Sequence, residues 1–153
     1  MSASMTEVLR PSRLQRTSRE ALSALGVQFL LGMGTNLIGL PSENSDGSRI
    51  VAAVVLGLHA LVGLGIIIVG VRVLLAARAE GRGRGPALWA LVTGVVTFLI
   101  GVGTLLTDNG WLSFLMSVGF LAGAVLYVAT YMLGSRSAAS AAGTAPSVRR
   151  PAA

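Results

Sequence analysis

The sequence predicts an all-α polytopic membrane protein, a bundle of four transmembrane helices. Of its 153 residues, 53% are hydrophobic and only 12% are charged, and the mean hydropathy is +0.75. Soluble domains carry about 25% charged residues, so lipid is the expected solvent. Four apolar stretches of about 20 residues match the length that crosses a bilayer. Most arginines flank alternate ends of these stretches, as in multi-pass proteins.

Turn-forming residues bound the predicted spans. Pro41 ends the first span, Pro86 opens the third, and Asp108–Gly110 form a tight turn before the fourth. Residues 1–18 are a cytoplasmic segment in which a short interfacial helix is expected. Residues 135–153, rich in Ala, Ser, Pro and Arg, are expected to be disordered. The transmembrane domain then covers 19–134, with spans at about 20–40, 50–72, 87–107 and 111–134.

Arginine placement predicts the orientation of the spans. Arginines precede the first span, fill the connection between the second and third, and follow the fourth. The opposite side holds only Arg49, which Glu43, Asp46 and Asp108 offset. Cytoplasmic flanks collect positive charge, so we expect both termini in the cytoplasm and the chain in the cell inner (cytoplasmic) membrane. The net charge of +6 adjoins apolar runs, which favours a lipid bilayer and no nucleic acid as partner.

An internal repeat relates the first span to the third. Residues 27–37 match residues 96–106 without a gap, including a Gly-x-Gly-Thr core in each. The second span aligns more weakly with the fourth, with residues 60–63 placed against 120–123. Because the first and third spans run in the same direction, the hypothesis is two repeated helical hairpins in parallel orientation. The alternative is chance similarity between glycine-rich apolar segments.

His59 is the single histidine of the chain. Counting 1.5 Å per residue from Ile50 places it roughly 13 Å from the outer boundary, near the bilayer midplane. An ionisable residue at that depth is a candidate functional group. Three polar side chains are predicted around it, either as a polar pathway or as a core network: Gln28, Asn36 and Thr97. In the core network, a neutral histidine hydrogen-bonds to Thr97 or Gln28.

Small residues form a stripe on each span. Helices associate in lipid through close backbone approach at such residues and through hydrogen bonds. The glycines Gly119 and Gly123, four residues apart, are expected to contact the neighbouring hairpin or to form a dimer seam. The predicted helix-packing positions are Gly32, Gly34, Gly63, Gly101, Gly103, Gly119 and Gly123.

The sequence offers no reaction centre. It has no cysteine, no nucleophile–base pair and no acidic residue embedded in a span, since Glu20 and Asp108 lie at the interfaces, so we expect no enzyme, no metal site and no resident cofactor. The leading hypothesis is a non-catalytic structural or interaction subunit that packs on itself or on another membrane protein through its small-residue faces. The alternatives are a pore or facilitator for a small solute around His59, and a haem- or quinone-binding membrane protein.

The run Leu31–Glu43, followed by the helix that carries His59, resembles small integral membrane proteins of high-GC actinobacteria that have no assigned activity. The resemblance covers the four spans and leaves out the tails. It implies a bacterial cell membrane and carries no catalytic motif.

Overall fold

The computed structural model describes residues 11–107 and 109–143, with side chains up to 135. These residues form long helices and no strand. Four of the helices are long and apolar enough to span a membrane, which makes the chain a multi-pass membrane protein. The elements are α2 (Arg13–Ile38), the short 3-10 helix η1 (Pro41–Glu43), α3 (Asp46–Ala79), α4 (Arg84–Thr107) and α5 (Gly110–Gly143).

The first and last of the four long helices, α2 and α5, extend beyond the spans predicted for them. α2 already begins at Arg13, where the Ser12 hydroxyl accepts a hydrogen bond from the backbone N–H of Gln15 at 3.1 Å. Residues 13–18 are thus continuous with the first span and do not form a separate interfacial helix; residues 1–10 lie outside the described part. α5 continues through Gly143, beyond the predicted end at Gly134, because the alanine-rich sequence there has high helix propensity. The expectation of disorder from residue 135 was therefore wrong for 135–143, and 144–153 are not described.

Gly39 ends α2 in the way that the glycine-proline sequence indicates. Its φ of 80° lies in the left-handed region, and its N–H donates to the carbonyl oxygen of Thr35. The Asn44 side chain then donates to the carbonyl oxygens of Ile38 and Leu40 at 3.0 and 2.8 Å. The backbone carbonyls left over at the end of α2 are thereby bonded within the turn.

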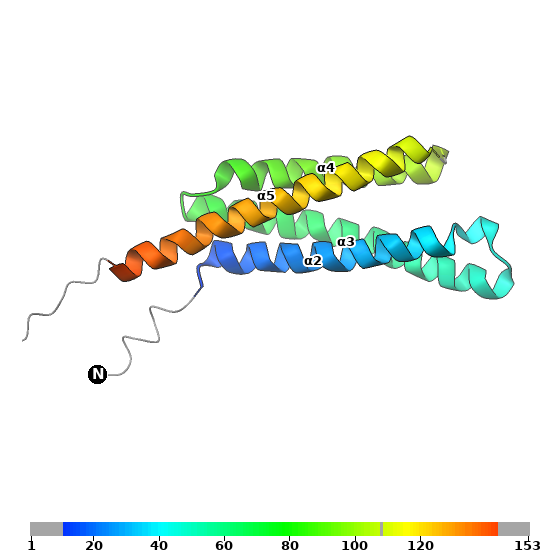
Figure 1. Ribbon diagram of the computed structural model, residues 1–153, viewed down its shortest axis with the longest axis horizontal. Coiled ribbons are helices and arrows are strands. Elements are labelled where there is room, and N and C mark those ends of the chain that lie inside the picture. The colour runs from blue at the N-terminus through cyan, green and yellow to red at the C-terminus, as the bar shows by residue number, and fades with distance from the viewer. Residues whose placement is uncertain (1–10, 108, 144–153) are drawn as a thin grey trace, which may run out of the picture.

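The four helices form a ring in chain order, in which α5 returns to pack against α2 (Figure 1). We call α2 with α3 the first hairpin, and α4 with α5 the second hairpin. The arginine-rich end of the molecule is where α2 begins and α3 ends, and the loop end is where α2 ends and α5 begins. In Figure 1 the two hairpins cross closely at the arginine-rich end and diverge toward the loop end.

The buried core lies almost entirely in the arginine-rich half. Its members come from all four helices: Leu14, Ala21, Leu25, Ile66, Val73, Leu74, Ala76, Ala77, Ala87, Ala90 and Tyr127. In the other half, large apolar side chains are exposed on every helix, with Leu37 and Leu106 each 81% exposed. Such exposure is costly in water and is expected in hydrocarbon, where apolar faces meet acyl chains.

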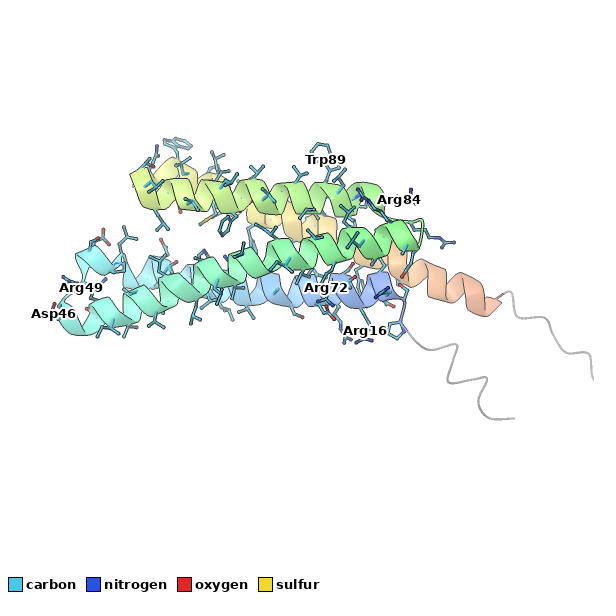
Figure 2. All side chains as sticks on the ribbon, turned by 180° about the vertical axis from the view of Figure 1, so that it is seen from behind. Arg16, Asp46, Arg49, Arg72, Arg84 and Trp89 are labelled. Atoms are coloured by element: carbon cyan, nitrogen blue, oxygen red, sulfur yellow. The ribbon has the colours of Figure 1, made fainter. Side chains whose placement is uncertain are left out.

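Tyr127 occupies the centre of the packed half. It is 2% exposed and reaches from α5 across the ring, so that a Cβ on Gly70 of α3 would lie 2.8 Å from its phenol oxygen. The same Cβ would lie 3.1 Å from Leu91 of α4. Tyr127 is therefore a core residue and not part of an aromatic belt, the layer of Trp and Tyr side chains often found at a membrane boundary. Trp89, by contrast, is exposed on the outer surface, as a belt residue would be (Figure 2).

Candidate functional site

The structure brings together two of the four polar residues predicted around the midplane. Gln28 of α2 and His59 of α3 are hydrogen-bonded, with 3.3 Å between the two Nε2 atoms. When His59 carries its proton on Nδ1, the Gln28 amide donates to the ring nitrogen Nε2. Both side chains are partly buried. The pair therefore ties the two helices of the first hairpin together at mid-depth.

Glycines give this pair its room. The imidazole of His59 packs over Gly32, where an added Cβ would lie 3.1 Å from ring carbon Cε1. An added Cβ on Gly63 would lie 3.3 Å from the Gln28 amide nitrogen and 3.3 Å from the ring of Phe98. Since Phe98 belongs to α4, the site lies where the first hairpin meets the second.

The pair leaves two polar atoms without partners. Gln28 Oε1 and His59 Nδ1 are buried, and neither has a hydrogen-bond partner within the described residues. Burying such an atom unpaired costs about 1–3 kcal/mol. One hydrogen bond between the two side chains cannot satisfy both, because each has a second polar atom that faces elsewhere. When His59 carries its proton on Nδ1, the two unpartnered groups are one hydrogen-bond donor, Nδ1–H, and one acceptor, Oε1.

Asn36 and Thr97 do not join this pair. Asn36 is exposed, about two turns nearer the loop end than Gln28. Thr97 of α4 lies against α5, where its hydroxyl occupies the space that a Cβ on Gly119 would fill. Sequence depth alone placed these residues at neighbouring levels but could not tell which side of each helix faces the histidine.

Phenylalanine side chains connect the two hairpins near the site. The rings of Phe29 on α2 and Phe120 on α5 lie 5.8 Å apart, and Phe98 contacts Gly63 on the other side of the bundle. Both contacts join one hairpin to the other. Toward the arginine-rich end they are followed by the buried core around Tyr127.

The two Gly-x-Gly segments make equivalent contacts in the two hairpins. An added Cβ on Gly32 would approach His59, and one on Gly34 would lie 3.3 Å from Val55. In the second hairpin the corresponding glycines are 69 positions later. A Cβ on Gly101 would lie 3.2 Å from the Met116 sulfur, and one on Gly103 would lie 3.4 Å from Leu112.

Met116 thus takes in the second hairpin the place that His59 takes in the first. The two residues are 57 positions apart, as are Val55 and Leu112. The alignment from sequence alone used an offset of 60 for these helices and so missed Met116. The signal available in sequence was the antiparallel spacing from each Gly-x-Gly segment, which fixes the opposing residue once the loop length is known.

The remaining predicted packing glycines differ in their contacts. Gly63 and Gly119 contact side chains of the same chain, as described above. Gly123 is buried, although no atom lies within 4 Å of the position where its Cβ would be. A search of the described residues for groups of three or more His, Cys, Asp or Glu side chains that are able to hold a metal ion found none.

Comparison of the chain with protein-family models, with curated proteins and with solved structures gave no match.

Proposed function

We propose that the chain is a non-catalytic integral membrane protein that acts as a structural or interaction subunit, and that the loop-end halves of its hairpins meet the partner. The observation that carries this proposal is the uneven packing of the bundle. The buried core lies in the arginine-rich half, whereas toward the loop end the hairpins diverge (Figure 1) and few of the described side chains are buried. The glycine faces are used inside the chain, so they support the hairpins and leave the diverging ends for a partner.

We further propose the cytoplasmic membrane as its location, with both termini in the cytoplasm. Support comes from the charge distribution. Among the described residues, the arginine-rich end carries Arg13, Arg16, Arg19, Arg72, Arg78, Arg82 and Arg84 against Glu20 and Glu80. The loop end carries Arg49 against Glu43 and Asp46. The positive end is the end that membrane insertion retains inside.

Site-directed crosslinking tests the interaction role, because the chain has no cysteine of its own. Leu37→Cys and Leu106→Cys place a reactive thiol on the exposed loop-end half, and Trp89→Cys places one on the exposed surface of the packed half. In native membranes we expect a thiol-attached photoreactive benzophenone, which reacts with C–H bonds of any neighbouring chain, to give one discrete adduct from the first two variants and none from the third. Adducts of equal yield at all three positions, or monomer at all three, would contradict the proposal.

A second candidate function is binding or facilitated passage of a small neutral solute at the Gln28–His59 pair. The unpartnered atoms Gln28 Oε1 and His59 Nδ1 favour it. Flux of small hydrogen-bonding solutes into vesicles should fall in His59→Ala and remain unchanged in Asn36→Ala, since Asn36 lies apart from the pair. Equal flux in wild type and His59→Ala would reject this candidate.

The equivalent contacts of the two hairpins support the hypothesis that one arose by duplication of the other. Three residues of α2, Gln28, Gly32 and Gly34, correspond to residues 69 positions later in α4. The residues that they contact on α3 correspond to residues 56 or 57 positions later in α5. We propose that both hairpins descend from one ancestral hairpin in parallel orientation, with the loop-length difference accounting for the smaller offset.

A further inference from the structure

A group of charged side chains lies on the outer surface of the first hairpin, apart from the site. Arg72 of α3 and Glu20 of α2 form an ion pair, with 3.3 Å between Nη1 and Oε2. Arg13 and Arg16 precede Glu20 by seven and four residues, so they share its face of α2. Three of these side chains are cationic, and that of Glu20 is anionic. We call Arg13, Arg16, Glu20 and Arg72 the arginine flank.

The arginine flank carries excess positive charge in an exposed position. Three guanidinium groups adjoin one carboxylate, which leaves a net charge of +2. The side chains of Arg72 and Glu20 are 58% and 43% exposed, and Arg13 and Arg16 are also exposed. Figure 2 shows Arg16 and Arg72 at the same edge of the molecule, with Arg84 at the opposite edge.

The same flank becomes apolar and indented toward the middle of the membrane. Val27 follows Glu20 by seven residues and Gly65 precedes Arg72 by seven, so both lie two helical turns nearer the loop end on the same side of their helices. Val27 and the intervening Ile68 are exposed. No atom lies within 4 Å of the position where Gly65 would carry a Cβ, so the α3 backbone is open to a neighbouring molecule.

We propose that the arginine flank binds one anionic phospholipid, whose phosphate pairs with Arg16 and Arg72 and whose acyl chain lies over Gly65. Guanidinium groups bind phosphate through paired hydrogen bonds, and arginine suits this geometry better than lysine. The order of features along the flank, charged at the end of the span and apolar toward its middle, is the order in a phospholipid. This inference does not depend on the proposed interaction role.

The other exposed arginines supply a matched control. Arg78 and Arg84 belong to the connection between α3 and α4, where the Arg84 guanidinium donates to the Arg78 carbonyl oxygen at 3.2 Å. Replacing both removes the same charge from the same end of the molecule. A lipid attracted only by overall charge would respond equally to either pair of substitutions.

Native mass spectrometry of the full chain, released from vesicles of equal phosphatidylglycerol and phosphatidylcholine, tests the proposal. We expect the wild type to retain phosphatidylglycerol preferentially. Arg16→Gln/Arg72→Gln should lower that preference about tenfold, and Arg78→Gln/Arg84→Gln by less than about threefold. Equal losses in both variants, or no preference in the wild type, would overturn the assignment.

Glu20→Gln provides a second test of the proposal, in which no arginine is replaced. The Glu20 carboxylate competes with lipid phosphate for Arg72, so its removal should raise the preference for phosphatidylglycerol about threefold. Because Glu20 is exposed, this variant retains the buried packing of the hairpin. An unchanged or lowered preference in Glu20→Gln would overturn the proposal, whatever the double variant shows.

Discussion

The two hairpins share one packing scheme and differ in what they place inside it. In each, a Gly-x-Gly segment of the first helix meets an opposing side chain of the second. In the first hairpin that side chain is His59, hydrogen-bonded to Gln28, and in the second it is Met116. An apolar residue thus occupies in the second hairpin the position that the histidine has in the first. The polar pair is the chemical difference between the two hairpins, and two of its atoms have no hydrogen-bond partner among the described residues.

Glycine substitution should give the largest difference in stability between the two hairpins. Gly32→Val would push against the rigid imidazole of His59, whereas Gly101→Val would meet the flexible thioether of Met116. We expect losses of about 2–3 kcal/mol and about 1 kcal/mol in the free energy of unfolding. Gly57→Val is the control, because Gly57 is exposed and has no atom within 4 Å of a Cβ. Unfolding in mixed micelles with increasing SDS measures all three, and equal losses would contradict the packing scheme.

The hydrogen bond of the first hairpin should appear as an energetic coupling. In a double-mutant cycle of Gln28→Leu and His59→Leu, we expect a coupling of about 0.6–1.7 kcal/mol, between the average and the maximum for side-chain hydrogen bonds within membranes. The same cycle with Thr97→Val and Met116→Leu serves as the comparison and should give a coupling near zero. A first-hairpin coupling no larger than that of the second would show that the polar pair is not bonded in the membrane.

The carboxylate of Glu80 stabilises the start of the first hairpin. Glu80, at the end of α3, accepts a hydrogen bond from the backbone N–H of Leu14 at 2.8 Å, which bonds a free donor at the start of α2. Glu80→Gln should lower the free energy of unfolding by about 0.5–1 kcal/mol, because a charged acceptor at a helix N-terminus becomes neutral. A free energy of unfolding for Glu80→Gln equal to that of the wild type would remove Glu80 from this role.

The four spans and two of the site residues, Gln28 and His59, could be predicted from sequence, for different physical reasons. Hydropathy over about 20 residues detects a membrane helix whatever its neighbours are. Depth within the membrane gave Thr97 or Gln28 as the partner of His59, and the structure pairs His59 with Gln28. The burial of Tyr127, the exposure of Asn36 and the correspondence of Met116 with His59 depend on how far each helix is rotated about its axis. In lipid, the apolar pattern that reports rotation in soluble proteins is weak, because both faces of a helix are hydrophobic.

The proposed interaction role depends most on a bundle that is closed at the arginine-rich end and open at the loop end. Pulsed electron paramagnetic resonance in lipid nanodiscs measures the distance between α3 and α4 at each end directly. Spin labels at Val54 and Leu106 report the loop end. Labels at Leu75 and Leu88 report the arginine-rich end, and all four positions are exposed. We expect the loop-end pair to give a clearly longer and broader distance distribution than the other pair. Equal distances at the two ends would contradict the divergence of the hairpins and the interaction role built on it.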